Sequence, residues 1–234
     1  MIDIHSHIIP GVDDGARNFD ESVGIIKELA AQGVTDIIAS PHFVNETIYV
    51  SPAKSNKELL EKLRGFLKDE GVEVNLYLGN EIFIDEDILG LLKKGLVSPL
   101  VGSKYLLVEL PFSETSMSYE DIFASLLENG YKVLLAHPER YPFFHDDYEK
   151  LVELYKNGVL FQCNMASLVG KYGKNAFKTV RRLAKDDFIF AFGNDAHHFG
   201  HNGYVKAAMK KLSKYYDKNG LKRVLEGNAK KILA

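Results

Sequence analysis

The sequence of 234 residues is 46% hydrophobic and 26% charged, with a formal net charge of −3, a balance typical of one globular domain near the size of a (β/α) barrel. The weak negative charge argues against nucleic-acid binding, which favours a basic surface, and the single cysteine, Cys163, excludes an intramolecular disulfide and favours a reducing compartment. Neither a charged-then-apolar leader nor an apolar run near the roughly 18 residues of a membrane span occurs, so we expect a cytoplasmic protein without a membrane span.

Apolar strands alternate with amphipathic helices along the whole chain. Strands are predicted at residues 2–7, 34–39, 74–78, 105–108, 132–136, 159–162 and 188–192. The first helix is predicted between a cap at Asn18 or Asp20 and an end at Gly33, and later helices at residues 53–70, 86–94, 118–130, 146–157, 174–185, 203–214 and 217–232. This alternation predicts a parallel sheet covered by helices, and seven strands favour a complete or incomplete barrel formed by residues 1–234 as one domain.

Residues that bind metal ions well fall where these strands end. His5 and His7 lie two positions apart on the first strand, so their side chains point to the same face. Asp13 and Asp14 follow in the adjoining loop as oxygen donors. Further candidates stand at the carboxyl ends of later strands: His42, Glu81, Glu109, His137, Asp195 and His197. Because these ends meet at one rim of a parallel barrel, the side chains are expected to converge there.

The chemistry of these side chains predicts more than one metal ion. Five histidines and four carboxylates, counting Asp14, suit manganese, iron or zinc, and no thiolate is present to form a closed structural zinc site. Nine ligands exceed the capacity of one ion, whereas three divalent ions with bridging groups would use them all. The positive charge of three divalent ions exceeds the negative charge of four carboxylates, and the excess would attract a phosphate dianion. Arg140, beside His137, would add further positive charge.

Other phosphate chemistries lack their residues. A cysteine phosphatase needs an arginine six positions after the nucleophile, but Val169 occupies that position after Cys163. The sequence also contains no Gly-x-x-x-x-Gly-Lys loop, no Gly-x-Gly-x-x-Gly fingerprint and no Gly-x-Ser-x-Gly elbow. Cys163 is therefore interpreted as a small packed residue.

Several stretches together resemble one family. They are residues 4–7 (IHSH), 10–16 (PGVDDGA), 40–42 (SPH), 79–82 (GNEI), 137–141 (HPERY), 164–173 (NMASLVGKYG) and 195–197 (DAH). The sequence resembles, from Met1 to at least His198, the manganese-dependent bacterial tyrosine-protein phosphatases of capsular and exopolysaccharide loci. These enzymes belong to the polymerase-and-histidinol-phosphatase (PHP) superfamily.

The resemblance implies a distorted TIM-like (β/α)7 barrel with three Mn²⁺ ions. The same ligands would also accept iron or zinc. It implies three ligand sets: His5, His7, Glu81 and Asp195 for the first ion; Glu81, Glu109 and His137 for the second, with Glu81 bridging; and Asp14, His42 and His197 for the third. Arg140, His42 and Asp14 are expected to be catalytic residues. The implied partner is the phosphorylated, tyrosine-rich tail of a bacterial autokinase that controls polysaccharide export.

The sequence departs from the family pattern at two places. Asn194 replaces a serine before Asp195, which we expect to be harmless. After His198, where many relatives carry an arginine that would help to bind phosphate, residues 199–202 read Phe-Gly-His-Asn. Arg17 or Lys171 is a candidate to take over that contact.

The predicted activity is hydrolysis of phosphotyrosine by in-line attack of a metal-bound hydroxide, with Arg140 orienting the phosphate. Three alternatives stay open at this point: a small-molecule phosphomonoesterase such as histidinol-phosphate phosphatase, an amidohydrolase, which also begins with His-x-His, and an inactive regulatory module. Only the loops at residues 43–52 and 111–118 are long, so the predicted site is open enough for a peptide. The intact set of ligands argues against the inactive module.

Overall fold

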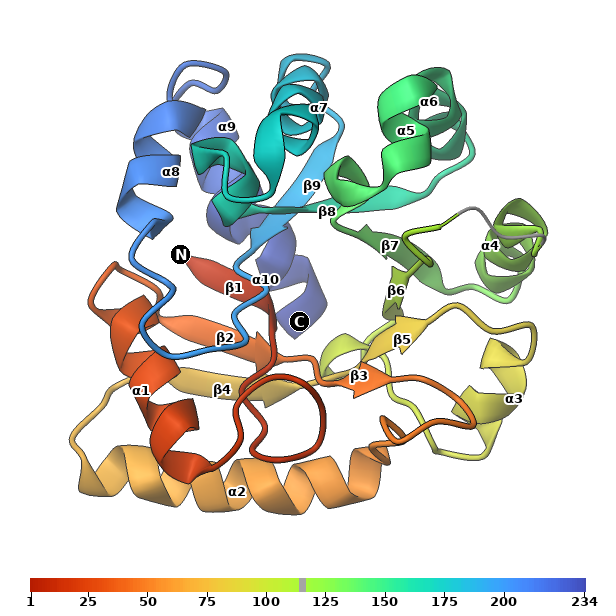
Figure 1. The fold of residues 1–234 in the computed structure, drawn as a ribbon. Helices are drawn as coiled ribbons and strands as arrows, with labels where there is room; N and C mark the ends of the chain where they lie inside the picture. Colours follow the sequence, from red (N-terminus) through yellow and green to blue (C-terminus); the bar gives the residue numbers. More distant parts are fainter. Residues whose placement is uncertain (114–116) are drawn as a thin grey trace.

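The computed structural model describes residues 1–113 and 117–234 and shows parallel strands surrounded by helices (Figure 1). Residues 114–116, within one of the two long predicted loops, lie outside the described residues. The strands are β1 (Ile2–Ser6), β2 (Asp36–Ala39), β3 (His42–Phe43), β4 (Asn75–Leu78), β5 (Glu81–Phe83), β6 (Tyr105–Glu109), β7 (Lys132–Ala136), β8 (Leu160–Asn164) and β9 (Ile189–Gly193).

The helices largely follow the predicted amphipathic segments. They are α1 (Phe19–Ala30), α2 (Ala53–Asp69), α3 (Ile88–Lys93), α4 (Tyr119–Glu128), α5 (Pro142–Asp146), α6 (Glu149–Lys156), α7 (Gly173–Lys185), α8 (Val205–Leu212), α9 (Lys218–Lys222) and α10 (Asn228–Leu233). Asn18 caps α1, because its side chain accepts a hydrogen bond from the Glu21 backbone N–H at 2.9 Å. The helix predicted at residues 146–157 is present as α6 over a shorter range, and non-helical backbone at Asp147 (φ −133°, ψ 87°) separates it from α5, which the sequence did not predict.

Two of the seven predicted strands, seen as β2 and β4, are each followed after a break by a short strand that was not predicted, and the strands divide into two sheets. One sheet has the order β1-β2-β4 and the other β3-β5-β6-β7-β8-β9, and every pair is parallel. The break between β2 and β3 falls at Pro41, which has no backbone N–H to donate to a neighbouring strand. The break between β4 and β5 falls at Gly79, where a Cβ atom would lie 2.6 Å from a methyl carbon of Leu100.

Backbone contacts between the first and last strands close the ring. Ser6 bridges Ala196 in parallel, the His7 N–H donates to the Ala196 carbonyl at 3.0 Å, and the Asp195 N–H donates to the His5 carbonyl at 2.7 Å. The chain therefore forms a distorted α/β barrel, as predicted from the sequence. Among the described residues, none of the helices combines the length and apolar character needed to cross a lipid bilayer.

Apolar packing fills the end of the barrel opposite the predicted metal ligands. Ile4, Ile38, Leu107 and Leu134 point inward from the strands and are fully buried together with Ile232 of α10. In Figure 1, α10 lies against the barrel behind β1. A second apolar layer packs the helices onto the outside of the strands. Polar side chains are thereby confined to the other end, where the strands terminate.

Candidate metal centre

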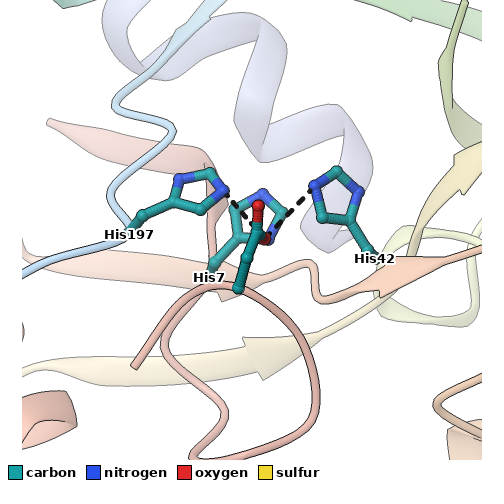
Figure 2. Close-up of side chains that lie close together, drawn as sticks. His7, His42 and His197 are labelled. Carbon is teal, nitrogen blue, oxygen red and sulfur yellow. Dashed lines mark ion pairs between the residues drawn. The ribbon is translucent and has the colours of Figure 1, made fainter. Parts of the chain in front are cut away.

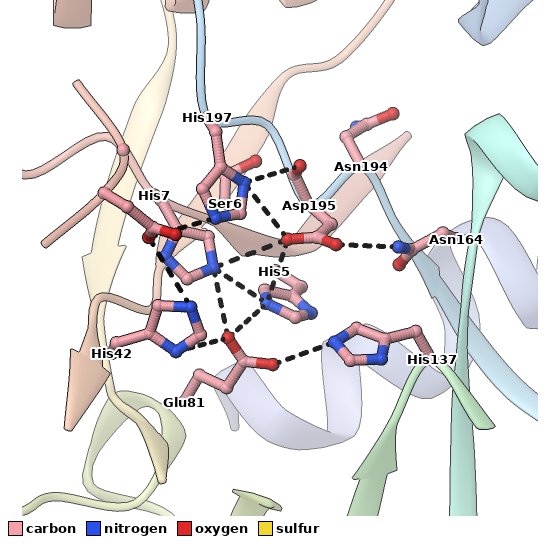
Figure 3. A network of polar contacts seen from close by, with 12 residues as sticks. His5, Ser6, His7, His42, Glu81, His137, Asn164, Asn194, Asp195 and His197 are labelled. Carbon is pink, nitrogen blue, oxygen red and sulfur yellow. Dashed lines mark hydrogen bonds and ion pairs between the residues drawn. The ribbon is translucent and has the colours of Figure 1, made fainter. Parts of the chain in front are cut away.

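The structure brings all nine predicted metal ligands together at one end of the barrel, and seven of them are labelled in Figure 3 around a common centre. Most stand at or just after the carboxyl end of a strand, as predicted. Asp14 lies in the loop after β1, also as predicted. His42 and Glu81 differ from the prediction, since they begin β3 and β5 after the breaks at Pro41 and Gly79. Their Cα atoms are direct partners in the parallel register, so pairing of β3 with β5 places the two side chains next to each other.

Glu81 lies at the centre of this cluster. Its Oε2 atom is 3.1 Å from His5 Nε2, 3.2 Å from His7 Nε2 and 3.1 Å from His42 Nδ1. Although this oxygen is buried, it makes no hydrogen bond to any described residue. Three imidazole nitrogens therefore surround a carboxylate oxygen without donating to it. A buried group of this kind needs a partner, and a cation shared by the three rings would supply one.

A second group of ligands begins at the other oxygen of Glu81. Its Oε1 atom lies 3.2 Å from His137 Nε2, and Glu109 Oε1 lies 3.5 Å from the same nitrogen. Glu109 Oε2 lies 3.7 Å from His42 Nδ1. The two oxygens of Glu81 thus face different groups of donors, which is the arrangement expected of a bridging carboxylate.

A third group lies toward solvent. Asp14 Oδ1 is 3.6 Å from His42 Nε2 and 3.4 Å from His197 Nε2. The His7 and His197 rings stack with centroids 3.9 Å apart, and Figure 2 shows His7, His42 and His197 around one point. Half of the Asp14 side chain is exposed, so this group forms the open side of the cluster. The division of ligands among three ions stays a prediction.

The electrostatics of the cluster also fit bound cations. Burial raises the pKa of Glu109, and the neighbouring carboxylates of Glu81 and Asp195 raise it further, to about 9. Burial and the Arg140 guanidinium lower the pKa of His137 to about 4. The protein charges alone therefore keep Glu109 protonated and His137 neutral. A divalent cation would allow Glu109 to ionise, and neutral imidazole is already the form that coordinates metals.

Side chains behind the ligands fix their orientation. Gln162 Oε1 accepts a hydrogen bond from His5 Nδ1 and Asp13 Oδ2 accepts one from His7 Nδ1, both at 2.8 Å. These acceptors hold a proton on Nδ1 and leave Nε2 of each ring free for a cation. Asp13 was predicted only as an oxygen donor and Gln162 only as the end of a strand. Polar Gln162 and Asn164 at alternate positions of an apolar strand are the signal that the sequence offered.

Arg140 reaches the cluster from the turn after β7. Its Nη1 donates to Asp195 Oδ2 at 2.6 Å, and the Asn164 amide donates to the same oxygen at 2.8 Å. The guanidinium carbon lies 4.9 Å from the centre of the Phe112 ring and 4.3 Å from that of Tyr172. With 22% of its side chain exposed, Arg140 is held at the surface of the site, where a phosphate could contact it.

The two candidates for a second phosphate contact differ in position. Arg17 is largely exposed, and its Nε donates to Glu21 Oε2 at 2.8 Å. Lys171 donates to the His201 carbonyl at 3.4 Å. Burial lowers the pKa of Lys171, with Asp195 and Arg140 close enough to influence it. Lys171 is thus the candidate that shares surroundings with Arg140.

The backbone is unusual at two predicted ligands. His137 (φ 34°) and Asp195 (φ 50°) adopt left-handed conformations that are uncommon for residues other than glycine. Near Asp195, Gly193 allows β9 to approach the cluster closely, since a Cβ atom there would lie 2.6 Å from His5 Cβ and 2.9 Å from Gln162 Nε2. The surrounding strands therefore impose a local geometry that brings the ligands together.

Known proteins are similar to this sequence over its whole length. Residues 1–234 match the family model described as "Capsular polysaccharide synthesis, CpsB/CapC". Tyrosine-protein phosphatase YwqE of Bacillus subtilis (strain 168) is 31% identical over 234 residues, covering 100% of this chain and 91% of YwqE. Tyrosine-protein phosphatase CpsB of Streptococcus pneumoniae is 26% identical over 239 residues, covering 100% of this chain and 98% of CpsB.

A solved structure agrees with these relatives. Described as one of YwqE from Bacillus subtilis and CpsB from Streptococcus pneumoniae, "unique metal-dependent tyrosine phosphatases", it matches with a TM-score of 0.88 and 30% identity, covering 94% of this chain and 90% of that chain. The chain belongs to the CpsB/CapC family of capsular polysaccharide synthesis. The family resemblance predicted from the sequence is confirmed, and its members include metal-dependent tyrosine phosphatases.

Proposed function

We propose that this protein is a metal-dependent protein-tyrosine phosphatase, with residues 1–234 forming one catalytic domain. The observation that carries the proposal is the Oε2 atom of Glu81, which is buried among three imidazole nitrogens and makes no hydrogen bond to a described residue. A cation explains this arrangement. The relatives named tyrosine-protein phosphatases supply the class of reaction.

We assign the ligands to three Mn²⁺ ions. The first would be held by His5, His7, Glu81 and Asp195, the second by Glu81, Glu109 and His137, and the third by Asp14, His42 and His197. Such ions, when bound, would supply Lewis acidity toward the phosphate oxygens and an activated nucleophile. The short distances within each group and the two differently directed oxygens of Glu81 support this assignment.

The remaining polar side chains would position the substrate and the ligands. Arg140, exposed on one side and hydrogen-bonded to Asp195, would orient the phosphate and offset the charge that develops during transfer. Asp13 and Gln162 would keep the rings of His7 and His5 in the coordinating tautomer. Asp14 and His42, on the open side, are proposed as catalytic residues together with Arg140.

The proposed substrate is a phosphorylated tyrosine in a protein, specifically the tail of a bacterial tyrosine autokinase. The capsular role in the family description supports a partner in polysaccharide export. We propose that the reaction takes place in the cytoplasm. Cys163, buried and unpaired, is compatible with a reducing compartment.

The experiment that tests this function is hydrolysis by chelator-stripped protein to which manganese, zinc or magnesium is added separately. The substrates are p-nitrophenyl phosphate, a phosphotyrosine peptide and histidinol phosphate. We expect manganese to restore turnover and the phosphotyrosine peptide to give the highest kcat/KM. A preference for histidinol phosphate would overturn the substrate assignment, and inactivity with each metal would overturn the enzyme assignment.

A further inference from the structure

A partly exposed aromatic side chain, Phe112, lies beside the candidate metal centre. It is the third residue after β6, which ends at Glu109. The Phe112 ring is nearly parallel to that of His137, with centroids 5.8 Å apart and an interplanar angle of 10°. The Tyr141 ring packs against the Phe112 ring, with their centroids 5.3 Å apart. These contacts hold the ring in place, yet 43% of the residue remains exposed.

Phe112 also adjoins the proposed phosphate-binding residue. Its ring centre lies 4.9 Å from the guanidinium carbon of Arg140, a distance typical of cation–π contact. Arg140 is fixed from elsewhere as well, because Tyr172 packs against it and Asp195 accepts its hydrogen bond. A phosphate bound by Arg140 would therefore lie close to the exposed surface of Phe112.

Phe66 provides a useful contrast. It has the same exposed fraction of 43%, but it stands on α2 and stacks on Phe19 at 4.7 Å. Among the described residues, the ring contact of Phe66 is with Phe19, which is not a candidate metal ligand. Phe112, in contrast, touches both a candidate ligand and Arg140. Its position, rather than its exposure alone, points to a role in binding.

We propose that Phe112 binds the aromatic ring of the substrate and thereby makes the site prefer aryl over alkyl phosphates. This inference rests on the proposed function, for which it names the group that selects the substrate. In phosphotyrosine the ring is bonded directly to the ester oxygen, so a phosphate at Arg140 brings that ring within the stacking range of Phe112. Phosphoserine has a single methylene at this point and offers no ring.

The test compares two ligands that cannot be hydrolysed, phenylphosphonate and methylphosphonate. Their dissociation constants are measured by calorimetry with manganese-loaded wild-type protein and with F112A, F112L and F112Y. An aromatic pair of ordinary strength predicts that F112A and F112L lose about 3- to 10-fold in preference for phenylphosphonate. F112Y keeps the ring and is expected to retain the preference. F66A is the matched control and should behave as wild type.

The ratio of the two affinities separates ring binding from general damage to the site. If F112A and F112L weaken both ligands equally, Phe112 only supports Arg140 or His137 and the inference is wrong. An unchanged ratio in all variants would also overturn it. The binding measurement does not depend on turnover, so the two proposals can fail separately. A wild-type protein that hydrolyses no phosphoester would contradict the proposed function. A ratio of affinities that depends on Phe112 would still support a site that binds aryl phosphates.

Discussion

The Asp13 carboxylate offers a direct test of how the ligands are oriented. Its Oδ2 accepts from His7 Nδ1 at 2.8 Å and from the His42 backbone N–H at 2.9 Å, while Oδ1 accepts from the Gly15 N–H at 3.0 Å. Asparagine has only one acceptor oxygen. In D13N an amide N–H would therefore face either the two donors at Oδ2 or the one at Oδ1.

The geometry sets the expected size of the effect. At least one hydrogen bond is lost and two donors are placed against each other, which costs about 1–3 kcal/mol of folding free energy. If the amide faces His7, its ring loses the acceptor that fixes Nδ1–H. Loss of such a partner weakens metal affinity by about 10- to 100-fold. We therefore expect D13N to bind Mn²⁺ more weakly and to unfold at a lower temperature.

The measurements are calorimetric titration with Mn²⁺ and thermal unfolding with and without chelator. D20N is the matched control, because Asp20 is an exposed aspartate in the first turn of α1 and is not one of the candidate ligands. It should leave manganese affinity unchanged. Equal affinity in D13N and wild type would refute the argument, since it would show that the orientation of His7 does not depend on Asp13.

Three further predictions follow from the same cluster. The pKa of Glu109 in the folded protein is about 9, above its unfolded value, so in chelator-treated protein Glu109 lowers the stability increasingly as pH rises from about 4.5 toward 9. E109Q should therefore raise the unfolding free energy of metal-free protein by about 3 kcal/mol at pH 7 and by little at pH 4, as measured by denaturant unfolding. Calorimetric titration should show that E109Q binds Mn²⁺ more weakly. R140A should lower kcat/KM for a phosphotyrosine peptide by about 100-fold or more with manganese content retained, and R140K should recover only part, because lysine lacks the planar fork; full activity in R140A would exclude a role in transfer. G193A, whose Cβ would meet His5 at 2.6 Å, should destabilise the protein by about 1–3 kcal/mol in denaturant unfolding. G203A should be neutral, because apart from its two chain neighbours no described residue has an atom within 4 Å of the added Cβ.

The convergence of the candidate ligands at one rim could be predicted from the sequence, because two local patterns determine it. Alternation along β1 places His5 and His7 on one face, and apolar runs that end in polar residues locate the carboxyl ends of the other strands. The same reasoning failed where a strand is interrupted. Nothing local shows that β3 resumes after Pro41 or that His42 becomes the register partner of Glu81, because that pairing depends on contacts between distant segments.

The positioning residues were harder to predict for a similar reason. Gln162 is 157 residues from His5 in the sequence, and only closure of the barrel between β1 and β9, with β8 alongside, brings its amide to Nδ1. Phe112 follows a strand like many loop residues, and its importance depends on its contacts with His137 and Arg140. Such roles belong to the assembled barrel rather than to any one segment.

Asp13 and Asp14 show most clearly what could not be predicted from the sequence, since these adjacent residues are chemically identical but their side chains face different partners. The loop folds back on β1, where the Ala16 N–H donates to the His7 carbonyl at 3.0 Å, and Gly15 fits because a Cβ atom would lie 2.3 Å from that oxygen. This fold turns Asp13 toward His7 Nδ1 and leaves Asp14 facing His197. Which carboxylate faces the proposed metals is thus decided by the backbone of the loop, and a residue larger than glycine at position 15 would disturb both at once.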